Sequence, residues 1–370
     1  MDLKMRKIFT ALLLAISLCG TACLSVFADG NPEEMANDKV SSTSTQVAEL
    51  PARSALLMDA ASGRILFEKN ADEPMPPASI TKIMTLLLTF EAISGGKLNY
   101  ADKISCSEHA NSMGGTQIWL EVGEQMTAEE LMKATAINSA NDAAMALAEY
   151  IGGSETGFVE MMNQKARTLG MKNTHFVNPT GLDAEGHIST ARDIAIMSKE
   201  LLKHKDITKF STIWMDSLRD GKTGLTNTNK LVRFYKGCTG LKTGTTDGAG
   251  SCLSASAERN GLSLVAVSMG SSTSDERFDT CRTLLDFGFA AFEPYTPVLL
   301  SEELTPITVT KGTETQVEFF VEKPSPILIP KGRGSDVKKA IAMQSDVEAP
   351  VRKGQSMGEA QFTLDGETLC

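Results

Sequence analysis

The most constraining feature of this sequence is a segment at residues 78–90 that is apolar on almost every side. Two prolines precede it and Gly95-Gly96 follow it, and these are the start and stop signals of a helix. A helix without a polar face cannot lie at the surface, because it would leave apolar side chains in water. We therefore expect a buried central helix, around which the rest of the domain packs.

Strand patterns lie on both sides of this helix in the sequence. Before it, residues 55–59 and 64–68 read as two strands joined by an Ala-Ser-Gly loop. Well after it, three more strands and a closing helix are predicted at 241–245, 251–256, 262–268 and 276–287. Asn260-Gly261 is a strong hairpin turn between the last two strands. This order predicts an α/β (α+β) fold in which an antiparallel sheet is flanked by helices.

Helix signals fill the part of the chain between the two groups of strands. Thr127 and Glu130 have the spacing of a capping box, in which each side chain binds the other residue's backbone N–H. The helix that they begin is expected to end near Asn138. Further helices are predicted at 142–151, at 155–169 and after Thr190.

The two ends of the chain differ from the middle in composition. Basic residues precede an apolar run at 8–18, and Ala28 suits a cleavage site, so 1–28 is predicted to be a secretory signal peptide. An uncleaved anchor is the alternative, although the run is short for a membrane span. A polar, flexible leader is predicted at 29–46 and a main domain at 47–292. Short β patterns at 307–310, 316–321 and 327–329 indicate a small all-β domain at 293–370.

Charge and cysteine content bear on the possible partners. The formal net charge is −10, so the chain lacks a basic field for phosphate backbones and no nucleic-acid partner is expected. Of seven cysteines, Cys106, Cys238, Cys252, Cys281 and Cys370 lie outside the signal, and an odd number cannot pair completely. Cys238 and Cys252 flank a strand turn, where a disulfide and two free thiols are both compatible with the pattern. No spacing indicates zinc, and neither a metal nor a cofactor is expected.

Ser79 and Lys82 lie three residues apart at the start of the apolar helix. Residues at this spacing share one helix face, so the lysine amine can reach the serine hydroxyl. A serine becomes a nucleophile when a neighbouring base takes its proton, and a lysine can be that base when burial lowers its pKa. The spacing alone is a weak signal, because Ser335 and Lys338 repeat it in the polar part of the small domain.

Two further motifs follow in the chain. Ser139 and Asn141 lie in the break between two predicted helices, and Lys242-Thr243-Gly244 lies on a predicted strand. Another Lys-Thr-Gly, at 222–224, leads into a loop-like stretch, so we place the function on the copy at 242–244. There a glycine lets a substrate approach the strand edge. The three motifs in this order resemble those of the penicillin-recognising serine enzymes.

The resemblance extends beyond the three motifs, from about residue 48 to the end of the chain. Asn178-Pro-Thr-Gly-Leu-Asp, His187-Ile-Ser-Thr-Ala-Arg-Asp and Gly240-Leu-Lys-Thr-Gly are similar to segments of the low-molecular-mass penicillin-binding proteins. These are serine-type D-alanyl-D-alanine carboxypeptidases. The resemblance implies a β-lactamase/transpeptidase-like catalytic domain at 47–292. It also implies an exported hydrolase that removes the terminal D-alanine from peptidoglycan stem peptides.

The resemblance also implies a role for each motif residue. Ser79 attacks the peptide carbonyl, Lys82 accepts its proton, and the N–H groups of Ser79 and Thr245 hold the oxyanion. The implied catalytic residues are Ser79, Lys82, Ser139 and Asn141, and the implied substrate-binding residues are Lys242, Thr243, Gly244, Thr245 and Arg277. A β-lactam acylates the same serine in such enzymes. His187 is expected to be a structural loop residue.

Three departures from the family pattern and three alternative functions remain at this point. Ala140 replaces a frequent glycine, and Thr245 stands where other members carry histidine or tyrosine. The chain ends at Cys370 without the amphipathic helix that usually lies on the membrane, so membrane association stays open.

A serine β-lactamase shares all three motifs. An endopeptidase or transpeptidase differs only in its acceptor or leaving group. A non-catalytic sensor would have lost some of the motif residues, and here they are all present.

Overall fold

The computed structural model describes residues 49–318, 320–322 and 324–370. The predicted signal peptide and almost all of the sequence before the first strand lie outside the described residues. Among the helices that the structure does describe, none is both long enough and apolar enough to cross a membrane.

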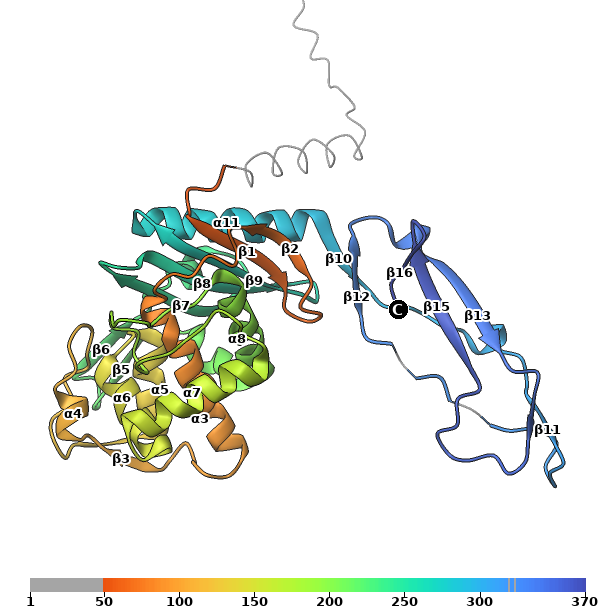
Figure 1. Ribbon diagram of the computed structural model, residues 1–370, viewed down its shortest axis with the longest axis horizontal. Helices are drawn as coiled ribbons and strands as arrows, with labels where there is room; N and C mark the ends of the chain where they lie inside the picture. The colour runs from red at the N-terminus through yellow and green to blue at the C-terminus, as the bar shows by residue number, and fades with distance from the viewer. Residues whose placement is uncertain (1–48, 319, 323) are drawn as a thin grey trace, which may run out of the picture. The chain divides into compact units, whose positions relative to one another are not determined.

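A five-stranded antiparallel sheet lies at the centre of the main domain (Figure 1). Its order is β2-β1-β9-β8-β7, so strands from before and after the helical region meet in one sheet. Asn260 and Gly261 turn between β8 and β9 with φ of 50° and 79°, as their sequence predicts. The predicted fold class is confirmed. The strands are β1 (Ser54–Asp59), β2 (Ile65–Lys69), β7 (Cys238–Thr246), β8 (Gly250–Arg259) and β9 (Leu262–Ser271).

Helices cover both faces of this sheet (Figure 1). α11 (Ser274–Ala291) packs on one face against β8 and β9. α8 (Ala191–Lys203) packs on the other face, together with the rest of the helical region. Neighbouring side chains of β1 point into different cores, since Leu56 faces the helical region and Leu57 faces α11. The sheet is therefore buried on both sides.

The apolar segment forms the predicted central helix, with one difference at its start. The α-helix α3 runs over Lys82–Ser94, and the residues before it form a 3-10 turn, η1 (Ala78–Thr81). Every α3 residue from Lys82 to Phe90 is buried. The α-helix begins later than expected because Ala78 has a left-handed φ of 49°, which is incompatible with a continuous α-helix. Ser79 therefore lies in a tight turn of its own.

The longer helices of the helical region agree with the sequence signals, whereas its short helical elements were not predicted. Thr127 and Glu130 form the predicted capping box, with the Glu130 carboxylate accepting from the Thr127 N–H at 2.8 Å. A short break after this helix contains Ser139, as expected. The predicted helices are α5 (Ala128–Ile137), α6 (Asn141–Gly152), α7 (Glu155–Leu169) and α8, and the elements that were not predicted are α4 (Glu108–Asn111), η2 (Lys205–Ile207), α9 (Thr208–Ser211) and α10 (Leu231–Phe234).

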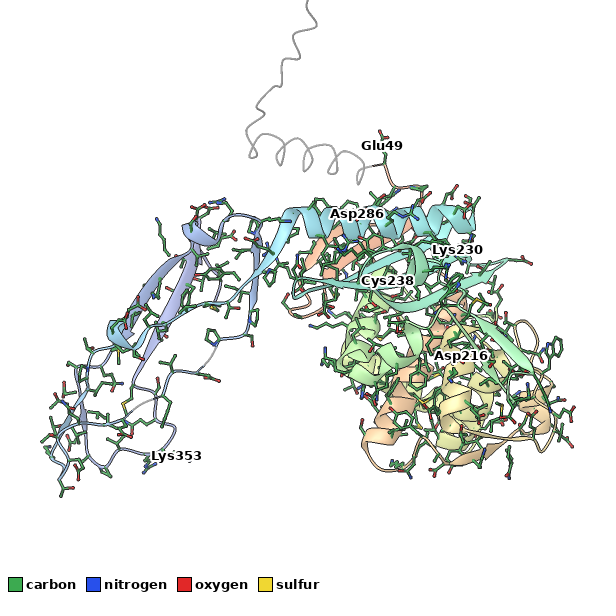
Figure 2. The ribbon with its side chains drawn as sticks, turned by 180° about the vertical axis from the view of Figure 1, so that it is seen from behind. Glu49, Asp216, Lys230, Cys238, Asp286 and Lys353 are labelled. Carbon is green, nitrogen blue, oxygen red and sulfur yellow. The ribbon has the colours of Figure 1, made fainter. Side chains whose placement is uncertain are left out.

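Two small antiparallel strand pairs were not predicted. They are β3 (Lys103–Ser105) with β4 (Gln125–Thr127), and β5 (Met215–Leu218) with β6 (Thr223–Thr226). The second pair corrects part of the loop expected after the other Lys-Thr-Gly copy, because Leu225 and Thr226 of that stretch lie in β6. Asp216 of β5, labelled in Figure 2, binds Lys133 at 2.8 Å and so joins this pair to the helical region.

The C-terminal region is all β, as predicted, and the strands expected at 307–310 and 327–329 form as β11 (Thr308–Thr310) and β12 (Ile327–Pro330), but the one expected at 316–321 does not. Among the described residues of 316–321 no strand forms, and only Gln316 makes an isolated bridge, to Thr308. The expected strand was therefore wrong there. The other elements are β10 (Phe292–Tyr295), η3 (Ser301–Glu303), η4 (Gly334–Asp336), β13 (Lys338–Met343), β14 (Asp346–Glu348), β15 (Gly358–Leu364) and β16 (Glu367–Thr368).

The five cysteines outside the predicted signal are free thiols in the described structure. The register of β7 and β8 places Ala257 opposite Cys238 and Gly244 opposite Cys252, so these two cysteines do not face each other. Cys238, labelled in Figure 2, lies at the start of β7. The sequence was compatible with a disulfide here, and the strand register rules it out.

Candidate active site

The turn η1 brings the first motif together. Ser79 is half-buried, Lys82 is fully buried, and 3.0 Å separates the Ser79 Oγ from the Lys82 Nζ. In a 3-10 turn, side chains three residues apart lie directly above one another, which explains the short distance. The sequence predicted this contact from α-helical spacing, whereas the structure makes it in the tighter turn.

Lys82 has two further partners, and both are pure acceptors. Its Nζ lies 2.6 Å from the Asn141 Oδ1 and 2.6 Å from the Thr180 carbonyl oxygen. A neutral amine has two hydrogens and one lone pair. The two hydrogens are used by these oxygens, so the lone pair is left to point at the Ser79 hydroxyl. The contacts thus fit a neutral lysine that can accept the serine proton.

The surroundings of Lys82 also favour the neutral amine. Burial is the main cause that holds the pKa of Lys82 well below the usual value, and the positive charge of Lys242 lowers it further. The carboxylate of Asp142 acts in the opposite direction with a smaller effect. Lys82 therefore has the properties of a general base, which an exposed lysine does not have at neutral pH.

In the second motif, the loop at residues 114–116 fixes the orientation of the Asn141 side chain. The Asn141 Nδ2 donates to the Gly114 carbonyl at 2.6 Å, and the Asn141 N–H donates to the Thr116 carbonyl at 2.7 Å. The amide oxygen must then point at Lys82. Ser139 is buried with a left-handed φ of 64°, at the break between α5 and α6. Its hydroxyl has no hydrogen bond to another described residue.

The third motif lies on β7, the edge strand of the sheet. Lys242 is buried, and burial together with the charge of Arg277 lowers its pKa to about 7. The Thr243 hydroxyl donates to the Thr228 hydroxyl at 2.7 Å. A side chain at Gly244 would come within 3.0 Å of the Ser79 nitrogen, so only glycine allows the strand to lie this close to the nucleophile.

Arg277 reaches the same strand from α11. Its side chain is 8 % exposed, and its Nη1 donates to the Gly244 carbonyl at 2.9 Å and to the Thr245 hydroxyl at 2.8 Å. Among the described residues it forms no ion pair, and its buried Nε has no hydrogen-bond partner. Burial is the main cause that lowers its pKa. A buried guanidinium without a carboxylate is suited to an anionic group of a ligand.

A fourth segment, at 178–187, completes the site and was not identified as functional from its residues. Thr180 supplies the carbonyl that holds Lys82, and Pro179 supplies one that the Thr85 hydroxyl binds at 2.6 Å. At Gly181, with φ of 84°, a Cβ would lie 1.9 Å from the Ala78 carbonyl oxygen. The segment therefore presses directly on the turn that carries Ser79.

We predict that Gly181→Ala strongly reduces acylation by penicillin, by about tenfold or more, because Ala78 and with it Ser79 must move. Gly186→Ala is the matched control: its φ is also positive, at 77°, but its nearest atom is 4.0 Å away. The control carries only the backbone cost of about 1 kcal/mol. Stopped-flow acylation and thermal unfolding of both variants separate the two effects. Equal acylation rates in the two variants would contradict this assignment.

The family follows from a match that spans most of the main domain. The family model described as "D-alanyl-D-alanine carboxypeptidase" matches residues 40–273. This chain belongs to that family. A second model, "Penicillin-binding protein 5, C-terminal domain", matches residues 292–370. The resemblance inferred from the motifs is thus confirmed, as is the enzyme class of a D-alanyl-D-alanine carboxypeptidase.

Individual relatives are similar over most of the chain. The D-alanyl-D-alanine carboxypeptidase DacF of Bacillus subtilis is 44 % identical over 370 residues, which cover 99 % of this chain and 92 % of DacF. The crystal structures of penicillin binding protein 5 from Haemophilus influenzae include a chain 33 % identical, with a TM-score of 0.76, covering 87 % of this chain and 95 % of that one. Penicillin-Binding Protein D2 from Listeria monocytogenes, solved in an ampicillin-bound form, is 32 % identical with a TM-score of 0.60, covering 65 % and 98 %.

Proposed function

We propose that this carboxypeptidase removes the terminal D-alanine of peptidoglycan stem peptides through an acyl-enzyme on Ser79, with Lys82 as the base. One observation carries the proposal: the Lys82 amine is buried, held by two oxygen acceptors, and 3.0 Å from the Ser79 hydroxyl. Release of D-alanine from a diacyl-Lys-D-Ala-D-Ala peptide tests it.

Acylation begins when Lys82 takes the Ser79 proton and the Ser79 Oγ attacks the carbonyl carbon between the two D-alanines. The carbonyl oxygen becomes an oxyanion, which the N–H groups of Ser79 and Thr245 stabilise. The bond to the nitrogen of the terminal D-alanine then breaks. Lys82 returns the proton to this nitrogen by way of Ser139, while Asn141 holds the Lys82 amine and Lys242 completes the network around the bound substrate. D-alanine leaves, and the shortened peptide remains as an ester.

Deacylation needs a water molecule and the same base. The water gives a proton to Lys82 as its oxygen attacks the ester carbonyl, the bond to the Ser79 Oγ breaks, and the Ser79 oxygen takes that proton from Lys82. A β-lactam presents an amide carbonyl to the same serine, and the relative solved in an ampicillin-bound form supports binding of a β-lactam. Rapid turnover of penicillin would instead indicate a serine β-lactamase. A lasting adduct without any release of D-alanine would indicate a sensor.

We propose that Arg277 binds the terminal carboxylate of the stem peptide, together with Thr243 and Thr245. The support is its lack of an acidic partner among the described residues, and its contact with the strand segment that lies against Ser79. Thr245 is exposed beside it, while Thr243 is buried. An anion at this point would satisfy a guanidinium that the described protein leaves without a counter-charge.

We expect Arg277→Gln to lower kcat/KM for the free-acid peptide by about 10- to 100-fold, the usual effect of losing a hydrogen bond to a charged group. A peptide with a C-terminal amide should lose much less. Arg282→Gln on the exposed side of the same helix is the control, because among the described residues Arg282 hydrogen-bonds only to Asp279. The assay is D-alanine or D-alaninamide release. An equal loss for both peptides would contradict carboxylate binding.

We also propose that the protein acts outside the cytoplasm, where peptidoglycan stem peptides are found. The basic and apolar residues at 1–28 support removal of a signal peptide on export. The mass of the N-terminal peptide of the exported protein measures this directly. The boundaries of the catalytic domain at 47–292 and of the small β domain at 293–370 stay predictions.

A further inference from the structure

His187 lies against the turn that carries the nucleophile, although it belongs to none of the three motifs. Its side chain is 2 % exposed, and its ring contacts Phe176 edge-on with 5.9 Å between the centroids. The Nδ1 lies 2.9 Å from the Val177 backbone nitrogen, and the Nε2 lies 2.8 Å from the Thr81 Oγ1. Thr81 is the residue immediately before Lys82.

These two contacts fix the tautomer of the ring. A backbone N–H can only donate, so the Nδ1 must accept from Val177 and carries no hydrogen. The ring hydrogen is then on the Nε2, which donates to the Thr81 hydroxyl. Burial is the main cause that lowers the pKa of His187 to about 4, with a smaller contribution from His175 and an opposing one from Asp183. The ring is therefore neutral at neutral pH, as the contacts require.

The turn η1 is held at its end by a backbone bond from the Lys82 N–H to the Ser79 carbonyl oxygen, but it is less well held at its start. It begins at Ala78 with an unfavourable φ of 49°, and its hydrogen bond from Ile80 to Pro77 is long, at 3.2 Å. The Thr81 side chain makes no capping bond to the following helix. The position of Ser79 relative to Lys82 thus depends on this backbone bond and also on the neighbouring segments that pack against the turn.

We propose that His187 is a positioning residue for acylation, which holds Thr81 through its Nε2–H and so keeps the Ser79 hydroxyl within reach of Lys82. The inference rests on the proposed roles of Ser79 and Lys82. His187 has no hydrogen bond to either residue, so it carries no proton in the reaction and acts through Thr81. A displacement of the reacting atoms by about 1 Å can lower a reaction rate by about 100-fold. Loss of the Thr81 bond should therefore lower the acylation rate even where the fold is kept.

Two pairs of variants separate the Thr81 bond from the fold of the loop. His187→Gln can keep a donor at the place of the Nε2, while His187→Asn can keep an acceptor at the place of the Nδ1 and loses the contact with Thr81. Thr81→Ser keeps the hydroxyl, and Thr81→Val removes it with little change in shape. Each variant is tested as the full chain by stopped-flow acylation with a fluorescent penicillin, which resolves the binding constant from the acylation rate, and by thermal unfolding.

We expect the acylation rate to fall about tenfold or more in His187→Asn and Thr81→Val, with little change in the binding constant. His187→Gln and Thr81→Ser should stay within about threefold of the unchanged protein. The double variant His187→Asn/Thr81→Val should be no slower than the slower single variant, because both remove the same bond.

Several outcomes would overturn this inference. One is a Thr81→Val protein that acylates at the unchanged rate, a result that stands even if His187→Asn does not fold. Another is a loss confined to the binding constant, or the same loss in His187→Gln as in His187→Asn. Failure of the proposed function looks different, because Ser79→Ala would then still be acylated, whatever the His187 variants do.

Discussion

Replacing Ser79 with alanine is expected to abolish both D-alanine release and covalent labelling by penicillin, a loss of at least about 10⁴-fold in kcat/KM. The reason is that the hydroxyl oxygen forms the acyl bond, and no other described hydroxyl hydrogen-bonds to the Lys82 amine. The residual rate should reflect only substrate binding and oxyanion stabilisation. D-alanine release from a diacyl-Lys-D-Ala-D-Ala peptide and gel detection of bound fluorescent penicillin measure the two losses.

The chain contains its own control for this experiment. Ser335 and Lys338 repeat the motif spacing, but both are exposed, and neither side chain hydrogen-bonds to another described residue. Ser335→Ala should therefore leave both assays unchanged. Thermal unfolding should be similar for the two variants, since Ser79 is only half-buried and alanine fits in its place. A Ser79→Ala protein that still releases D-alanine would refute the assignment of the nucleophile.

Local signals account for most of the fold that could be predicted. The turn at Asn260-Gly261 and the capping box of Thr127 with Glu130 involve neighbouring residues only, so their residue types are sufficient to place them. The central helix was predicted because apolarity on all sides leaves burial as the only solution. The strand expected at 316–321 was wrong, because an alternating pattern does not specify a partner strand.

The motif residues of the site could be predicted, but much of what holds them could not. Lys82 is oriented by the carbonyl of Thr180, 98 residues away, and any residue has a carbonyl, so the sequence contains no signal for this contact. His187 contacts Thr81, 106 residues before it, and the sequence contains no signal for this contact either. The turn at Gly181 could be predicted in part, since an Asn-Pro-Thr-Gly segment indicates a turn. The sequence does not indicate which residues this turn contacts.

Lys82→Arg should lower the acylation rate by about 10²- to 10⁴-fold, the usual contribution of a general base. Arginine keeps the positive charge but does not lose its proton in proteins, so the variant separates a base from a simple cation. Lys82→Met is the second variant, because it is neutral and fits a buried site if the guanidinium disturbs folding. Lys338→Arg at the exposed copy of the motif is the matched control. Retention of most activity by Lys82→Arg would show that only the charge matters.

The pH dependence gives an independent test of the same role. The pKa of Lys82 is held well below its usual value, and the reaction needs the neutral amine, so acylation should rise with pH as Lys82 loses its proton. Lys242 has a pKa of about 7, and the proposed network uses its ammonium form. Acylation should therefore fall again as Lys242 loses its proton, which gives the pH profile a descending limb. Arg277 lowers the pKa of Lys242, so Arg277→Gln should move that limb to higher pH. If the descending limb does not move in Arg277→Gln, a group other than Lys242 causes it. If the ascending limb disappears in Lys82→Met, Lys82 is the group that causes that limb.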